Sequence, residues 1–194
     1  LSMPYNATIP AVDAQRKTMS HLTGRRIVDL VKQDITLSQL VTRESFENAI
    51  KVLSAIGGST NAVIHLLALA GRLEIDLSLE DFDKFGAGIP LLTDIQPSGR
   101  FLMEDFHYAG GLPVVLNHIR EHLHLDVPTV FGATLGEMID GAECYNSEVI
   151  RDMDNAVKPD SGIWVLQGNL CPDGAVMKPS AASPELFQHK SKAM

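Results

Sequence analysis

The chain has 194 residues, of which 45% are hydrophobic and 21% are charged, and its formal net charge is −8. These proportions are typical of a packed soluble protein of one domain or slightly more, and they differ from those of a disordered chain. The excess of carboxylates and the lack of a basic stripe argue against a nucleic-acid partner, and the longest apolar run, residues 62–70, is too short to cross a membrane.

Apolar residues at helical spacing predict that the first part of the chain is mainly helical. The first helix is expected over residues 11–34, with Gly24 as its weakest point. A second helix begins after Thr42, whose hydroxyl is a suitable N-cap, and it stops at the pair Gly57-Gly58.

The next helix, over residues 59–71, is apolar on nearly every face, and we therefore expect it to be buried. Ser78 and Asp81 resemble a capping box for a short helix that ends at Gly86. The remaining helices are expected over residues 103–109 and in the segment whose first turn contains Pro113.

Short apolar runs predict strands at residues 89–95, 129–131, 163–166 and 175–178. The last two runs are joined by a loop of Gly, Asn, Pro and Asp residues, in which we place a turn at Asp173-Gly174. We therefore expect these two strands to form a β-hairpin.

Helix signals become sparse after about residue 146. We therefore predict a domain boundary within residues 146–152, with residues 1–148 in a first domain and residues 149–194 at the start of a second. The first residues, Leu-Ser-Met-Pro, and the last ones, His-Lys-Ser-Lys-Ala-Met, do not resemble natural termini. We expect the chain to be a window of a longer polypeptide.

The string Gly57-Gly58-Ser59-Thr60-Asn61 joins two expected helices and is the first candidate for a binding site. Glycines let the backbone approach a ligand closely, and the following helix start offers unpaired N–H groups at the positive end of its dipole. With two hydroxyls and an amide beside them, such a turn suits a carboxylate, a phosphate or a polyol. The alternative is an ordinary helix–turn–helix connection in which a hydroxyl serves only as the cap.

A second candidate is the string from Met103 to Gly111, in which Glu104, Asp105 and His107 share one helical turn. Carboxylates and an imidazole this close together can bind a cation or transfer protons. A solvated helix face closed by glycines explains the same residues, and we favour that interpretation.

A third candidate is a zinc site, because His118, Glu121 and His122 match the zinc-peptidase pattern H-x-x-E-H. In this interpretation both histidines lie one turn apart on one helix face. The match has only three fixed residues, and an exposed polar helix end explains the segment as well.

The two cysteines, Cys144 and Cys171, are too few for a disulfide framework or a four-cysteine zinc site, which favours a reducing, cytoplasmic setting. Neither has the histidine arrangement that marks a thiol nucleophile, so each is interpreted as an ordinary loop cysteine. Lys178, on the last expected strand, either meets an anionic substrate or is a solvated side chain.

Several long strings follow one another through the whole chain: LSMPYNATIPAVDAQRK, GRRIVDLVK, AIGGSTNAVIHLLALAG, DLSLEDFDKFG, IPLLTDIQPSGRFLMEDFHYAGGLPVVL and GNLCPDGAVMKPSAA. Taken together, they resemble the dihydroxy-acid and phosphogluconate dehydratase family, which includes sugar-acid dehydratases. The residues of PSGRFLMEDFHYAGG and GAVMKPSAAS resemble the pentonate and related sugar-acid dehydratases more than they resemble the branched-chain enzyme.

The resemblance implies an α/β fold, in which a large N-terminal α/β domain precedes a smaller β-barrel domain and the active site lies between them. This chain would be the helix-rich later part of the first domain, followed by the first strands of the barrel. The implied reaction removes water from a 2,3-dihydroxy acid, a small-molecule substrate, to give a 2-keto-3-deoxy acid. The implied cofactors are an iron–sulfur cluster and Mg²⁺, and full-length members are commonly homo-oligomers.

The resemblance places the cluster cysteines and nearby magnesium ligands upstream of Leu1, and the serine base with a glutamate ligand beyond Met194. We therefore expect no catalytic residue, no metal ligand and no turnover from this chain alone.

Within the chain, the expected substrate-binding residues are Ser59, Thr60 and Asn61. The expected supporting residues are Gly57, Gly58, Glu104, Asp105, His107 and Lys178. Three alternatives stay open: a branched-chain dihydroxy-acid dehydratase, a non-catalytic fragment or interaction module, and a zinc hydrolase.

Overall fold

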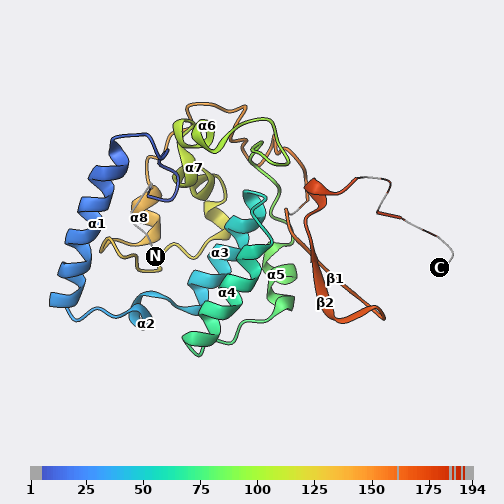
Figure 1. Ribbon diagram of the computed structural model, residues 1–194, viewed down its shortest axis with the longest axis horizontal. Helices are drawn as coiled ribbons and strands as arrows, with labels where there is room; N and C mark the ends of the chain where they lie inside the picture. The colour runs from blue at the N-terminus through green and yellow to red at the C-terminus, as the bar shows by residue number, and fades with distance from the viewer. Residues whose placement is uncertain (1–5, 161, 184, 186, 189, 191–194) are drawn as a thin grey trace.

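The computed structural model describes residues 6–160, 162–183, 185, 187, 188 and 190, and it shows a helical body with a β-hairpin on its C-terminal side (Figure 1). The α-helices are α1 (Gln15–Lys32), α2 (Leu37–Leu40), α3 (Arg43–Ala55), α4 (Asn61–Arg72), α5 (Leu79–Gly86), α6 (Met103–Tyr108), α7 (Gly111–His118) and α8 (Leu135–Ile139). The other elements are the 3-10 helices η1 (Arg120–His122) and η2 (Pro179–Ala181) and the strands β1 (Trp164–Gly168) and β2 (Cys171–Met177). This arrangement confirms the expected fold class of a helix-rich α/β fragment.

Helix α3 forms where the sequence predicts it because capping and apolar periodicity agree. The backbone N–H of Thr42 donates to Ser45 Oγ at 3.2 Å, as part of a capping box at the helix start. The apolar positions at helical spacing are buried, namely Phe46, Ile50 and Leu53. The chain leaves the helix through Gly57, whose φ of +55° is a left-handed conformation that glycine adopts without steric cost.

Helix α4 also forms as predicted, but the expectation that it is buried is wrong. Only Val63 and Ala70 are buried, whereas Ile64 is 68% exposed and Leu69 is 42% exposed. Within the described part of the chain, the main helix contacts of α4 are those with α3 and α5 (Figure 1). These two neighbours cover only part of the apolar surface of α4, so the rest of that surface is exposed in the described part of the chain.

The segment 89–95 is extended, as predicted, but it does not form a strand ladder among the described residues. It makes isolated bridges, in which Leu91 pairs with Lys158 and Thr93 pairs with Ile150. Its middle is nevertheless deeply buried, so the apolar run correctly marks a core segment.

The strand predicted over residues 129–131 is wrong. This segment enters a turn between Pro128 and Thr134, which form an isolated bridge. The hydroxyl of Thr129 donates to the carbonyl oxygen of Ala133 at 2.7 Å and closes the turn locally. A side chain bonded to its own loop in this way competes with strand pairing.

The two largest clusters of buried apolar side chains stabilise the described part of the body. The larger cluster includes residues of α7, and its most deeply buried members are Ala55, Leu92, Val115, Ile119, Val149 and Ile150. The second joins the helices α3, α4 and α5 through Ile50, Leu53, Val63, Phe82 and Ile163. Because Ile163 directly precedes β1, this second cluster also attaches the hairpin to the helical body.

The predicted hairpin is confirmed, but its turn is not where we placed it. Leu166 pairs with Ala175 and Gly168 pairs with Cys171, so the chain reverses at residues 169–170. Asp173 and Gly174 therefore lie inside β2, opposite an irregularity in the ladder. The sequence is ambiguous here because both Gly-Asn and Asp-Gly pairs are typical of turns.

No helix in the described part of the chain is both long and apolar enough to cross a membrane. This finding agrees with the absence of a long apolar run in the sequence.

Candidate functional site

The glycine-rich string lies where α3 ends and α4 begins. Gly57 and Gly58 are closely surrounded, because a Cβ on Gly58 would lie 2.4 Å from Leu53 Cδ1. The hydroxyl of Ser59 accepts a hydrogen bond from the backbone N–H of Asn61 at 3.2 Å. The turn is thus fixed by backbone packing, while Ser59 and Asn61 are exposed.

The side chains of Thr60 and Asn61 keep their bonding capacity. Thr60 is the N-cap residue of α4, yet its side chain makes no capping hydrogen bond. Among the described residues, neither of these two side chains has a hydrogen-bond partner. A hydroxyl and an amide are therefore available at the start of a 12-residue helix.

Two distant segments pack directly on this turn. A Cβ on Gly162 would lie 2.6 Å from Gly57 Cα, and the N–H of Gly162 donates to the carbonyl oxygen of Ser54 at 3.3 Å. From the other side, Thr93 Oγ1 donates to the carbonyl oxygen of Ile56 at 3.0 Å. The sequence before β1 and the segment 89–95 therefore hold the turn in place.

A cavity of about 200 Å³ lies next to the turn. Leu91 and Gly162 line this cavity and also touch the position of Gly57. The complete set of lining residues is Leu91, Lys158, Asp160, Gly162, Trp164, Pro179, Ser180 and Phe187. Through Leu91 and Gly162, the cavity thus links Gly57, at the start of the glycine-rich string, to Pro179 and Ser180 of the string over residues 168–182.

Lys178 directly precedes this part of the cavity wall and is half-buried. Burial lowers the pKa of its ammonium group. Lys178 does not itself line the cavity. Its predicted contact with an anionic substrate stays a prediction.

The residues Glu104, Asp105 and His107 lie elsewhere, on α6. Asp105 accepts the backbone N–H of Leu102 at 2.7 Å, so it caps the start of the helix. Glu104 is exposed, and His107 Nδ1 is hydrogen-bonded to Thr8 Oγ1 at 3.1 Å. This group shares no residue with the cavity beside Gly57, so the structure does not bring the two candidate sites together.

His107 lines a different cavity of about 330 Å³, together with Tyr108, Glu143 and Tyr145. Burial and the nearby carboxylates of Asp13 and Glu104 raise the pKa of the Tyr108 hydroxyl. These two carboxylates disfavour an anionic ligand beside the Tyr108 hydroxyl.

The geometric basis of the zinc interpretation is wrong. Helix α7 ends at His118, so His118 and His122 do not lie on one continuous helix. His118 Nδ1 is bonded to the carbonyl oxygen of Arg151 at 2.9 Å. Over the described part of the chain, no three His, Cys, Asp or Glu side chains are grouped so that they could hold a metal ion.

The cysteines do not supply a cluster site either. Cys144 and Cys171 are both half-buried free thiols, and Cys144 Sγ donates to the carbonyl oxygen of Ile150 at 3.5 Å. Iron–sulfur clusters are held by several thiolates, commonly four. The described residues therefore do not fit an iron–sulfur cluster or Mg²⁺, and we derive no step through either group.

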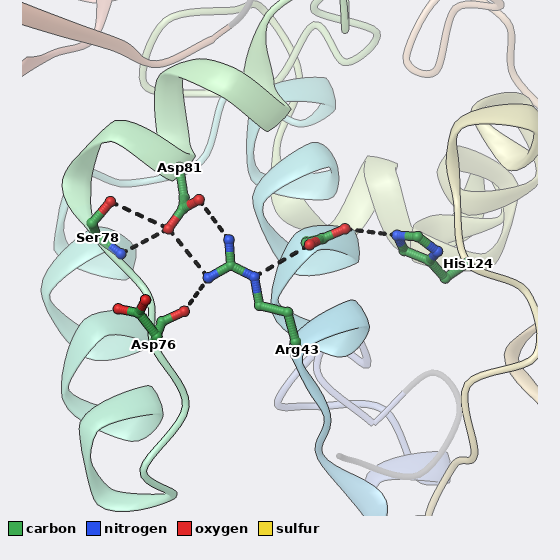
Figure 2. A network of polar contacts seen from close by, with 6 residues as sticks. Arg43, Asp76, Ser78, Asp81 and His124 are labelled. Atoms are coloured by element: carbon green, nitrogen blue, oxygen red, sulfur yellow. Dashed lines mark hydrogen bonds and ion pairs between the residues drawn. The ribbon is translucent and has the colours of Figure 1, made fainter.

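A charged network that the sequence analysis missed ties α3 to α5 (Figure 2). Arg43 donates to Asp81 Oδ1 at 2.5 Å, to Glu47 at 3.2 Å and to the backbone oxygen of Asp76. Glu47 in turn contacts His124 Nε2 at 2.7 Å. Only the capping pair Ser78–Asp81 was visible in the sequence, because the partner of Asp81 lies 38 residues away.

Within this network, opposing effects act on the pKa of Asp81. Burial favours a higher pKa, but hydrogen bonds from the Arg43 guanidinium and the Ser78 backbone N–H outweigh it and lower the pKa. The carboxylate of Asp81 is therefore the preferred form, and it holds α5 against the first turn of α3.

Two family models match this chain. The N-terminal model of the dihydroxy-acid/6-phosphogluconate dehydratases matches residues 1–138, and the C-terminal model of the same family matches residues 148–194.

The curated relatives agree with this match. A dehydratase of Rhizobium meliloti (strain 1021) is 54% identical over 193 residues, and an L-arabinonate dehydratase of Rhizobium leguminosarum bv. trifolii (strain WSM2304) is 52% identical over 196 residues. A dihydroxy-acid dehydratase of Ignicoccus hospitalis is 45% identical over 195 residues. Each alignment covers the whole of this chain but only 34% or 35% of the relative, so the chain spans about a third of the length of these relatives. The chain belongs to the dihydroxy-acid/6-phosphogluconate dehydratase family.

Proposed function

We propose that this chain is part of a hydro-lyase that converts a 2,3-dihydroxy acid, specifically a sugar acid, to a 2-keto-3-deoxy acid. The observation that carries the sugar-acid assignment is the order of the relatives. Two that are 52% and 50% identical are named L-arabinonate and L-arabonate dehydratases, whereas two dihydroxy-acid dehydratases, of Ignicoccus hospitalis and Caldanaerobacter subterraneus, are 45% and 42% identical. A relative named 6-deoxy-6-sulfo-D-gluconate dehydratase, also 42% identical, adds a third kind of acid to the family.

In this proposal the turn Gly57–Asn61 binds oxygen atoms of the substrate. Support comes from the available side chains of Thr60 and Asn61 at the start of α4, because a helix N-terminus favours negative charge. The close packing of Gly57 against Gly162 gives the turn a rigid backbone, which limits the entropy lost on binding. Glu104, Asp105 and His107 have a supporting structural role away from this turn.

The chemistry of the proposed reaction requires a base that removes the proton α to the carboxylate and a Lewis acid that assists departure of the 3-hydroxyl. If the full-length enzyme carries the iron–sulfur cluster and Mg²⁺ that the family resemblance implies, those groups would supply this Lewis acid. This chain's own residues bind and orient the acid, and we assign no proton transfer to any of them.

The division of the chain at residues 148/149 is also part of the proposal. It is supported by the two family models, which leave residues 139–147 between them. Limited proteolysis of the full-length protein tests it, because cleavage in the more exposed stretch between residues 140 and 148 is expected before cleavage within α3 or α7. Preferred cleavage elsewhere would contradict the division.

The substrate is tested with the full-length protein, purified without oxygen. Formation of 2-keto acid is measured from a panel of pentonates and hexonates and from 2,3-dihydroxyisovalerate. Conversion of a sugar acid is the expected result. Conversion of the branched-chain acid alone would keep the reaction type but overturn the sugar-acid assignment.

The role of the turn is tested with Ser59→Ala and Thr60→Ala in the same protein, with the exposed Ser147→Ala as the matched control. We expect kcat/KM to fall in the first two variants while the free energy of unfolding stays within about 0.5 kcal/mol of the wild type. Unchanged kinetics in both variants would show that the turn does not bind substrate.

A further inference from the structure

The cavity beside Gly57 contains a hydroxyl whose bonding is incomplete. Ser180 lines this cavity from η2, and its Oγ is fully shielded from solvent. In the described part of the chain, Ser180 Oγ has no hydrogen-bond partner. A buried hydroxyl without a partner is unfavourable, so Ser180 gains from any ligand that bonds to it.

The shape of the site allows such a bond. Ser180 lines the cavity, and a serine side chain can occupy three staggered rotamers, so rotation about Cα–Cβ gives its hydroxyl other directions in which a ligand atom could be its partner. The cavity volume of about 200 Å³ is smaller than that of sites for drug-sized ligands, which begin near 300 Å³. A molecule of five or six carbon atoms is an appropriate size.

The other walls suit a polyhydroxylated chain. Trp164 and Phe187 form an aromatic side, with ring centroids 6.0 Å apart. Lys158 and Asp160 also line the cavity and are exposed. An ammonium group and a carboxylate are therefore next to the space that a ligand would occupy. Apolar walls with a few placed polar groups are typical of small-molecule sites.

We propose that this cavity holds the hydroxylated end of the substrate, beyond C3, and that Ser180 is a specificity-determining residue that hydrogen-bonds a hydroxyl there. The inference rests on the proposed sugar-acid function and on the position of the cavity, which shares Leu91 and Gly162 with the packing of Gly57. Ser180 thereby favours acids that carry hydroxyls beyond C3 over acids with an alkyl chain. Sites built to bond a hydroxyl discriminate strongly against analogues that lack it.

The experiment compares the wild type, Ser180→Ala and Ser147→Ala in the full-length protein. The substrates are a pentonate, 2,3-dihydroxybutanoate, which has no hydroxyl beyond C3, and 2,3-dihydroxyisovalerate. Loss of one neutral hydrogen bond predicts a kcat/KM about three- to tenfold lower for the pentonate with Ser180→Ala, mainly through KM. We expect no change for the two acids that lack outer hydroxyls, and no change for any acid with Ser147→Ala.

Further variants separate recognition from a structural role. Ser180→Thr keeps the hydroxyl and is expected to keep the preference for the pentonate. If Ser180→Ala does not fold, Trp164→Phe tests the aromatic side of the same cavity, and we expect a higher KM for the pentonate only. Equal losses on all three acids would indicate a structural role and overturn the inference.

The wild-type protein tests the sugar-acid function, and the Ser180→Ala variant tests the inferred role of Ser180. A wild type that converts only the branched-chain acid overturns the sugar-acid function, and the inference with it. A wild type that converts the pentonate, together with Ser180→Ala of unchanged selectivity, overturns the inference alone.

Discussion

Helices α3 and α4 are adjacent in the sequence and pack against each other, yet they relate differently to the rest of the molecule (Figure 1). Helix α3 has one apolar face, and the residues on it are buried, including Ile50 at 1% exposure. Helix α4 is apolar on nearly every face, but Ile64 on it is 68% exposed. A one-sided apolar pattern therefore predicted burial correctly, whereas the more apolar helix is the more exposed one.

The difference lies in the neighbours that each helix has. Helix α3 contacts α4, α5 and α7, so its apolar face is covered from several sides. Helix α4 contacts only α3 and α5 among the described elements with substantial contacts. An apolar groove of about 710 Å³ borders both helices, and Ala62, His65 and Leu66 of α4 contribute to its wall. The apolar content of a helix indicates how strongly its burial is favoured, but the elements that pack against it determine its exposed fraction.

The largest predicted effect contrasts one substitution in the two helices. Ile50→Ala in α3 is expected to lower the free energy of unfolding by about 2–5 kcal/mol, because it leaves a cavity in a closed core. Ile64→Ala in α4 is expected to change it by no more than about 0.5 kcal/mol. Urea denaturation of both variants measures the difference. Similar losses in the two would show that α4 is buried in solution.

Two glycine substitutions sharpen the comparison, one beside the turn that connects the helices and one near the C-terminal end of α4. Gly162→Ala places a Cβ 2.6 Å from Gly57 Cα and is expected to cost about 1–3 kcal/mol through overpacking. In α4, Gly71 has no atom within 4 Å of the added Cβ. Gly71→Ala should therefore stabilise the chain by about 0.5–1 kcal/mol through helix propensity. Opposite signs are the expected result of thermal or urea denaturation, and equal signs would contradict the packing described for the turn.

The charged network is tested by substituting Arg43 of α3, with Arg72 of α4 as the control outside the network. Arg43→Ala removes the hydrogen bonds that join α3 to α5 and should cost about 1 kcal/mol, since the pair is only partly shielded from solvent. Arg72→Ala, in the exposed last turn of α4, should cost about 0.3 kcal/mol through the helix dipole. A double-mutant cycle of Arg43→Ala with Asp81→Asn measures the coupling directly, and a coupling of zero would rule out the network as a link between α3 and α5.

The smallest predicted effect is the pH dependence of the same network. The folded-state pKa of Asp81 is lowered, so its contribution to stability is present above the unfolded-state pKa, near 3.9, and is lost as the pH falls through the folded-state pKa. Urea denaturation between pH 6 and pH 2.5 should show a shallower acid dependence for Asp81→Asn than for the wild type. Identical pH profiles would show that Asp81 titrates normally.

Much of the local structure was predictable because it depends on residues close in sequence. The N-cap position at Thr42, the helix end at Gly57 and the capping pair at Ser78 are local features, and all three positions were identified correctly. The expected cap by the Thr42 hydroxyl is wrong, because this side chain makes no capping hydrogen bond in the described part of the chain. The hairpin turn was misplaced because two adjacent pairs, at residues 168–169 and 173–174, have similar turn chemistry.

The candidate site was predictable only in part. The glycine-rich turn was recognised from its residues, but its neighbours, Gly162 and the cavity at Ser180, come from more than 100 residues later. Conversely, the histidines of α7 and η1 appeared to share a face only because the sequence did not reveal that α7 stops at His118.

The sequence by itself determined the family, the helix-rich fold class, the main helices and the existence of the hairpin, since periodicity and capping are local properties. Only the tertiary structure decided the exposure of α4, the separation of His107 from the Gly57 turn, and the meeting of that turn with Gly162 and Ser180. The physical reason is that contacts between distant segments depend on the apolar and polar surfaces that all elements present together. A local pattern of residues does not contain that information.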